Sequence, residues 1–218
     1  MNNLYNNFKK CINKNDNFNT TEFVISHERK FLYIQTKKAG SATINNILTK
    51  HTDSKHCGVE DLNNNDYTKF CVVRNPWDRM LSCYLNKIRD KDFNNDKFRN
   101  GIPKAFEQFN CFYANMTFQA FLEAVEKIDD YECDPHFRSQ YISLGILDST
   151  KIMDLIIRFE NFKEDLIKVF NTLGVYNFDI PTINKTNHGH YSYHYSEETK
   201  RIVSEKFKKD IKLFNYSF

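Results

Sequence analysis

Residues Lys69–Tyr84 read KFCVVRNPWDRMLSCY, and this stretch predicts a strand that runs directly into a helix. Its first six residues are mostly apolar and too few for a helix, which is typical of a buried strand. Asn75 and Pro76 then supply an N-cap and a residue suited to the first helical position. Large apolar side chains follow at helical spacing: Trp77, Met80, Leu81, Tyr84, Leu85 and Ile88.

Two other stretches repeat this order of strand and helix. Residues 30–35 read KFLYIQ, and after a loop of small and basic residues an apolar helical face follows at 44–48. Residues 154–159 read DLIIRF and precede an apolar helical stripe over 162–173. Asn161, three residues before a glutamate, predicts a capping box at the start of that last helix.

Three such units imply parallel strands joined by right-handed crossovers, and therefore an α/β fold with a parallel sheet covered by helices on both faces. We expect residues 1–25 to form a loose N-terminal arm and residues 26–218 to form a single domain. Further helices are predicted to begin at Thr117 and Ser196. In folds of this class, ligands bind beyond the carboxyl ends of the strands.

Composition excludes several classes of protein. The 218 residues carry a net charge of +3, too mild for a nucleic-acid-binding surface. Six cysteines include no C-x-x-C pair and no zinc-type cluster. No apolar stretch is long enough for a membrane helix, and no signal-peptide core begins the chain. We therefore expect a cytoplasmic protein without a metal, a nucleic-acid partner or an integral membrane segment.

The loop after the first predicted strand has the composition of an anion site. Lys38 brings a mobile positive charge, and Gly40 allows the backbone to approach a ligand closely. Ser41 and Thr43 add hydroxyl groups at the start of the following helix, where exposed N–H groups favour an anion. The loop lacks the G-x-x-x-x-G-K-[ST] pattern, which argues against a nucleoside triphosphatase.

The loop after the second predicted strand offers another anion site. Arg74 stands at the end of the strand, and Ser82 lies on the helix face that turns back toward it. A guanidinium fork and a hydroxyl suit a phosphate. The alternative is that Arg74 pairs with Asp78 or Glu60 and only supports the fold.

These residues resemble sulfotransferases that use 3′-phosphoadenosine 5′-phosphosulfate, most closely the carbohydrate (Golgi-type) branch and its bacterial relatives. The resemblance lies in KKAGSAT at 37–43 and in VRNPWDRMLSCY at 73–84, of which the second is the more specific. HFRSQ at 136–140 and RFENF at 158–162 extend it, so that it covers roughly residues 30–218. It implies a P-loop-like fold.

The resemblance also implies roles for individual residues. The loop that would hold the 5′-phosphosulfate comprises Lys38, Gly40, Ser41, Ala42 and Thr43. The 3′-phosphate would be held by Arg74 and Ser82, and Lys185 would belong to a loop that covers the nucleotide. Two positions depart from the family pattern, Lys37 where proline is usual and Ala42 where threonine is frequent.

Sulfuryl transfer needs positive charge near the breaking S–O bond and a base for the acceptor hydroxyl. Lys38 is the candidate for the charge. For the base, His56 is the first candidate because a similar histidine-containing segment occurs there in the family, His136 is the second, and Glu60 is the third. No metal is required, and the run HGHYSYHY at 188–195 is interpreted as a solvated aromatic loop.

The function implied is transfer of a sulfuryl group to a hydroxyl of an acceptor, most simply a saccharide, with adenosine 3′,5′-bisphosphate as the product. Loops at 90–115 and 129–145 are expected to bind the acceptor. Two alternatives stay open from the sequence: a nucleotide-binding protein of the same fold without turnover, and a kinase acting on a small hydroxyl compound.

Overall fold

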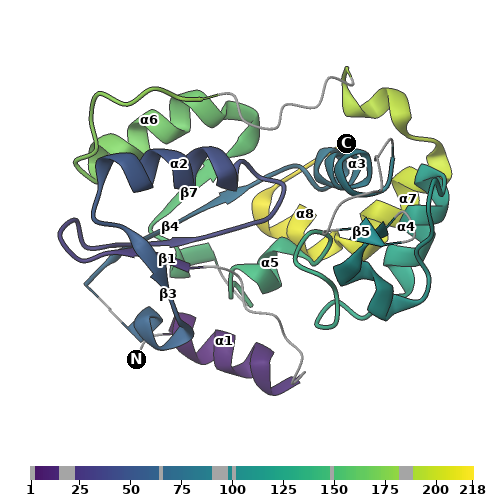
Figure 1. The fold of residues 1–218 in the computed structure, drawn as a ribbon, viewed down its shortest axis with the longest axis horizontal. Helices are drawn as coiled ribbons and strands as arrows, with labels where there is room; N and C mark the ends of the chain where they lie inside the picture. Colours follow the sequence, from purple (N-terminus) through teal and green to yellow (C-terminus); the bar gives the residue numbers. More distant parts are fainter. Residues whose placement is uncertain are drawn as a thin grey trace.

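A five-stranded sheet in the order β3-β1-β2-β4-β7 forms the centre of the computed structural model (Figure 1). The structure describes residues 3–14, 23–63, 66–89, 98–99, 102–147, 150–181 and 189–218. The strands of the sheet are β1 (Phe23–Ser26), β2 (Phe31–Ile34), β3 (Lys55–Cys57), β4 (Thr68–Val73) and β7 (Leu155–Arg158). A separate two-stranded ribbon pairs β5 (Phe98–Arg99) with β6 (Ile102–Pro103).

The sheet combines parallel and antiparallel pairing. The strands β2, β4 and β7 are parallel neighbours, which confirms the three predicted strand-and-helix units. The strands β1 and β3 run antiparallel to their neighbours and were not predicted. A turn over residues 27–30 reverses the chain between β1 and β2 and pairs Val24 with Tyr33. Four residues are too few for β1 to show a clear alternation of apolar and polar side chains.

Helices cover both faces of the sheet, as expected (Figure 1). One face packs against α2 (Ser41–His51) and α6 (Phe162–Thr172), whereas α1 (Asn3–Lys14) and α5 (Gln140–Ser143) lie on the other. Because side chains alternate along a strand, neighbouring residues of β2 serve different cores. Tyr33 packs with α2 and α6, while Leu32 packs with α1.

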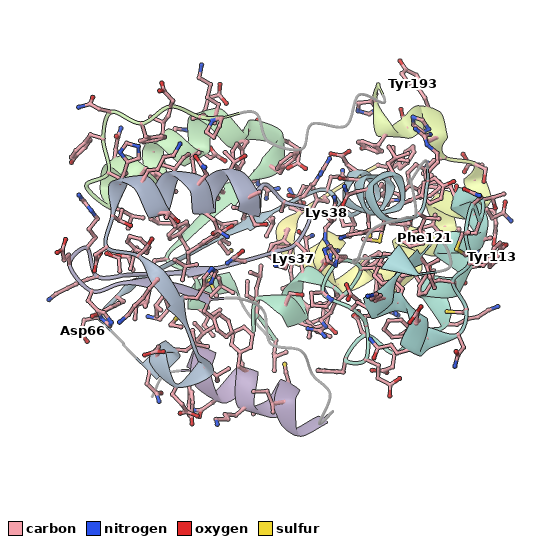
Figure 2. All side chains as sticks on the ribbon, viewed as in Figure 1. Lys37, Lys38, Asp66, Tyr113, Phe121 and Tyr193 are labelled. Carbon is pink, nitrogen blue, oxygen red and sulfur yellow. The ribbon has the colours of Figure 1, made fainter. Side chains whose placement is uncertain are left out.

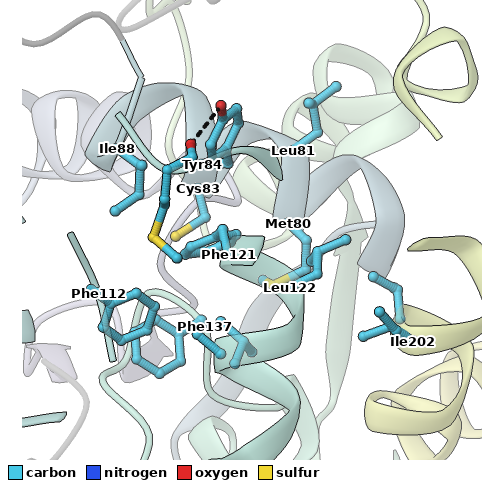
Figure 3. Close-up of a cluster of buried hydrophobic side chains, with 14 of the residues drawn as sticks. Met80, Leu81, Cys83, Tyr84, Ile88, Phe112, Phe121, Leu122, Phe137 and Ile202 are labelled. Atoms are coloured by element: carbon cyan, nitrogen blue, oxygen red, sulfur yellow. Dashed lines mark hydrogen bonds between the residues drawn. The ribbon is translucent and has the colours of Figure 1, made fainter. Parts of the chain in front are cut away.

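Beside the sheet, a group of helices has an apolar core of its own (Figure 3). It comprises α3 (Pro76–Lys87), α4 (Phe118–Lys127) and α7 (Glu197–Lys206). The hydroxyl of Tyr84 in α3 donates a hydrogen bond of 3.1 Å to the carbonyl of Met116, just before α4. This core fixes α3 relative to α4 and α7, and α3 begins just after β4.

The remaining elements are short. They are α8 (Lys208–Phe214) and the 3-10 turns η1 (Val59–Asn63), η2 (Lys104–Phe109), η3 (Thr150–Ile152), η4 (Phe159–Asn161) and η5 (Tyr191–His194). None of the helices in the described ranges is both long and apolar enough to cross a membrane.

All four predicted helix starts are confirmed, because α6 also begins directly after Asn161, but the capping box predicted at Asn161 is not formed. The Asn75 side chain accepts hydrogen bonds from the second and third residues of α3. Thr117 caps α4, and Ser196 forms a capping box at the start of α7. The Asn161 side chain makes no capping hydrogen bond in α6. The last predicted helix is divided at Phe207 into α7 and α8.

Residues 3–14, expected to belong to a loose arm, form the helix α1 on the sheet. Leu4, Phe8 and Cys11 lie on one side of this helix and are fully buried. Gly145 permits the contact, because a Cβ atom there would lie 2.7 Å from the Phe8 ring. A boundary after residue 25 would also divide β1. The segment is polar overall, so the narrow apolar stripe of this helix was not recognised in the sequence.

Replacing Phe8 by alanine should lower the free energy of unfolding by about 3–5 kcal/mol, because a fully buried ring is removed from the contact between α1 and the sheet. Urea denaturation measures the change. The control is Lys10→Ala on the exposed side of the same helix, expected to change stability by less than about 0.5 kcal/mol. Equal stability of the two variants would contradict the docking of α1.

Candidate active site

A cavity of about 190 Å³ lies where the three parallel strands end. Arg74 is the first residue after β4, and Phe159 is the first residue after β7. The loop that begins at Thr36 starts two residues after the end of β2. Figure 2 shows Lys37 and Lys38 between the sheet and the group of helices around α3. The lining residues are Lys37, Lys38, Gly40, Ser41, Ala42, Thr43, Arg74, Ser82, Asn86, His136 and Phe159.

The loop between β2 and α2 has two residues in the left-handed region of the backbone. Lys38 has φ +69° and Gly40 has φ +79°. Gly40 could not be replaced without a clash, because a Cβ atom there would lie 2.7 Å from the ring of Phe162. This turn brings the N-terminus of α2 to the cavity, where its exposed N–H groups and helix dipole favour an anion.

Thr43 lies in the first turn of α2 and is only 5% exposed. Its hydroxyl donates a hydrogen bond of 3.3 Å to the carbonyl of Pro181. The same side chain thus lines the cavity and ties α2 to the segment that follows α6. A ligand that needs this hydroxyl as a donor must therefore displace the contact with Pro181.

The Arg74 side chain is held on several sides. Its Nε donates to Oδ2 of Asp78 at 2.8 Å, and its Nη1 donates to the carbonyl of Lys38 at 2.7 Å. The guanidinium carbon lies 4.1 Å from the centre of the Phe159 ring. The alternative pairing with Asp78 is therefore present, whereas Glu60 pairs with Lys9 instead. Arg74 nevertheless lines the cavity.

The backbone around Arg74 is fixed by hydrogen bonds from side chains. Gln140 accepts from the amide of Arg74 and donates to its carbonyl, both at 2.8 Å. Glu160 accepts a hydrogen bond of 2.6 Å from the amide of Asn75. These contacts satisfy backbone groups that a strand leaves unpaired at its end.

The half-buried His136 pairs with the buried Asp134 at the cavity. Nδ1 of His136 lies 2.7 Å from Oδ1 of Asp134, whose side chain is 7% exposed. Because a carboxylate only accepts hydrogen bonds, Nδ1 carries the proton of the neutral ring and Nε2 is left as an acceptor. Burial lowers the pKa of His136, and Asp134 offsets part of that effect. The lowered pKa favours the neutral ring, which is the form that can accept a proton.

His56 is not brought to this cavity. It lies exposed on β3, where it pairs with Val24 of β1. Because β3 is the edge strand on the side away from β4 and β7, His56 instead lines a separate hollow of about 40 Å³. Glu60 is not among the cavity residues either. Lys185 lies outside the described residues.

Four residues at the site were not identified from the sequence as site residues: Lys37, Asn86, Asp134 and Phe159. Lys37 directly precedes Lys38 and was noted only as a departure from the family pattern. Asn86 is four residues after Ser82 in α3, so helical spacing could have placed both on one face. Asp134 stands two residues before His136, a spacing at which an aspartate side chain accepts from the backbone N–H, as it does here at 2.8 Å. For Phe159 the signal was its position directly after β7.

Of three comparisons with known proteins, one finds a match. Searches among curated proteins and among solved structures find no match. A family model described as the sulfotransferase family matches residues 21–217. The match covers the whole sheet from β1 to β7, together with every residue that lines the cavity. The chain therefore belongs to the sulfotransferase family.

Proposed function

We propose that the protein transfers a sulfuryl group from 3′-phosphoadenosine 5′-phosphosulfate to a hydroxyl of an acceptor, with adenosine 3′,5′-bisphosphate as the second product. The observation that supports this best is the single cavity that contains the lysine loop, Arg74, Ser82 and His136. It offers an anion site at a helix N-terminus, a guanidinium with a hydroxyl, and a neutral histidine.

The donor would lie with its two charged ends at two parts of the cavity. The 5′-phosphosulfate would bind the N-terminus of α2, in contact with Lys38, Gly40, Ser41, Ala42 and Thr43. The 3′-phosphate would bind Arg74 and Ser82. Among the described residues Nη2 of Arg74 has no hydrogen-bond partner, so this nitrogen is the one that can donate to a phosphate. By the family resemblance, Lys185 would also contact the nucleotide.

In the reaction, the acceptor oxygen attacks sulfur while the bond between sulfur and the bridging oxygen of the 5′-phosphate breaks. Lys38 would stabilise the negative charge that develops on the bridging oxygen. Nε2 of His136 would take the proton of the acceptor hydroxyl, and Asp134 would orient the ring and stabilise its charged form. Lys38 and His136 line the same cavity.

For the acceptor we propose a saccharide, on the basis of the resemblance to carbohydrate sulfotransferases. The side chain of His136 is 26% exposed, which leaves its ring accessible to an acceptor at the mouth of the cavity. We place the reaction in the cytoplasm, because the cysteine spacing gives no disulfide framework.

Incubation with radiolabelled phosphosulfate donor and a panel of hydroxylated acceptors tests the proposed function. We expect label on at least one saccharide and release of adenosine 3′,5′-bisphosphate that depends on that acceptor. Binding of the nucleotide without release in the presence of any acceptor would instead indicate a binding protein. Phosphate transfer from ATP would indicate a kinase.

Replacing Lys38 by alanine should lower turnover by about 100-fold or more, because the positive charge at the bridging oxygen is lost. Steady-state transfer assays measure the effect, and circular dichroism checks that the variant is folded. Lys50→Ala, in the exposed last turn of the same helix α2, is the matched control and should retain turnover. Normal turnover in folded Lys38→Ala would refute the catalytic assignment.

Replacing His136 by alanine should lower turnover by about 100- to 10,000-fold and leave affinity for adenosine 3′,5′-bisphosphate almost unchanged, because the base touches the acceptor and not the nucleotide. His56→Ala should retain full turnover because His56 lies outside the cavity. Loss of turnover in His56→Ala, with His136→Ala fully active, would return the base to His56.

The pH profile gives a second test of His136. The base works only when it is neutral, so wild-type kcat/KM should fall as pH falls through the pKa of this residue. Because burial lowers that pKa, the midpoint of the decline should lie below about 6.5, the ordinary value for histidine. A midpoint clearly above 6.5, or the same decline in His136→Ala, would contradict the assignment.

A further inference from the structure

We propose that Arg74 positions the catalytic lysine in addition to reading the 3′-phosphate, so that one guanidinium couples the two ends of the donor site. This inference rests on the proposed function. Nη1 of Arg74 donates a 2.7 Å hydrogen bond to the carbonyl of Lys38, although the two residues are 36 positions apart in the chain. Arg74 thus contacts the backbone of the very residue that would act at the sulfuryl group.

The contact falls on a residue whose backbone needs support. Lys38 has φ +69°, a conformation in which the Cβ atom of any residue other than glycine is crowded. In an unsupported loop such a residue would relax toward negative φ. A change in the backbone angles of Lys38 would reorient its Cα–Cβ bond. The lysine side chain would then point in a different direction.

The guanidinium is itself held firmly enough to serve as an anchor. Asp78 accepts from Nε at 2.8 Å, the guanidinium carbon lies over the Phe159 ring at 4.1 Å from its centre, and Gln140 binds both the amide and the carbonyl of Arg74. The residue is only 7% exposed. A fork with this many fixed contacts transmits its position to the Lys38 carbonyl, whereas a mobile surface arginine would not.

The two roles use different nitrogens of the fork. Nη1 holds the loop, and Nη2 has no partner among the described residues. A donor that lacks the 3′-phosphate would still bind beside a loop that Nη1 of Arg74 holds in place. Loss of the guanidinium would remove the 3′-phosphate contact and the support of Lys38 together, so donor recognition and turnover should fail together.

Ser82 provides the matched control. It lines the same cavity and would contact the 3′-phosphate, and no hydrogen bond joins its side chain to the loop over residues 37–40 in the described structure. Ser82→Ala should therefore weaken binding of adenosine 3′,5′-bisphosphate alone. Arg74→Lys is the second variant, because it keeps a positive charge beside Asp78 but cannot hold Asp78, the Lys38 carbonyl and a phosphate in one plane.

The first experiment uses the protein without nucleotide. Amide hydrogen exchange of residues 37–41 should be faster by about 10-fold in Arg74→Ala and Arg74→Lys than in the wild type, and unchanged in Ser82→Ala. Exchange in the central strand β4 shows whether the variants remain folded. Wild-type exchange of the loop in both folded Arg74 variants would overturn the positioning role, whether or not the protein is a sulfotransferase.

The second experiment is calorimetry with adenosine 5′-phosphosulfate, which lacks the 3′-phosphate. Both Arg74 variants should bind it about 10-fold more weakly than the wild type, while Ser82→Ala should bind it normally. Turnover at saturating 3′-phosphoadenosine 5′-phosphosulfate should also fall in both Arg74 variants. An Arg74 that only read the 3′-phosphate would alter KM for that donor and nothing else, and this result would overturn the proposal.

A different result, from nucleotide binding by the wild type, would show that the proposed function is wrong. If the wild-type protein binds neither nucleotide, the proposed donor is wrong. The hydrogen-exchange comparison then still decides whether Arg74 supports the loop.

Discussion

Two arginines give the loop between β2 and α2 its shape, because they donate hydrogen bonds to carbonyl groups of that loop. The two arginines lie on either side of the start of α3. Arg74 binds the carbonyl of Lys38, and Nε of the fully buried Arg79 donates to the carbonyl of Lys37 at 3.3 Å. Each carbonyl accepts from a charged donor, which makes the hydrogen bond stronger than one between neutral groups. The shape of the loop therefore depends on a neighbouring element as well as on its own sequence.

The placement of α3 depends in turn on contacts from distant parts of the chain. Arg79 also donates to the carbonyl of Arg138, and Gln140 clamps the backbone of Arg74. The amide of Gln140 donates to Asp210 of α8 at 2.7 Å. The cavity thus lies at a junction where the sheet, α3, α5 and α8 are joined by buried polar groups, and such groups are costly to leave unpaired.

Sequence patterns predicted the parts of this structure that local rules determine. The strands β2, β4 and β7 are apolar runs followed by helices, so their parallel direction followed from periodicity and crossover handedness. The antiparallel strands β1 and β3 are too short to show a pattern. Which histidine reaches the cavity depended on how strands pair: β3 is at the far edge of the sheet, while His136 lies near α5 beside the cavity. No spacing in the sequence encodes that difference.

A crystal structure with adenosine 3′,5′-bisphosphate would show whether one cavity binds both charged ends of the donor. We expect the 5′-phosphate at the N-terminus of α2, in contact with Lys38 and the amide groups of residues 40–43. We expect the 3′-phosphate on Nη2 of Arg74 and on the hydroxyl of Ser82, with the Lys38 carbonyl still bound to Nη1. A nucleotide bound in another part of the molecule, or in the reverse orientation, would show that the cavity does not bind the donor in this way.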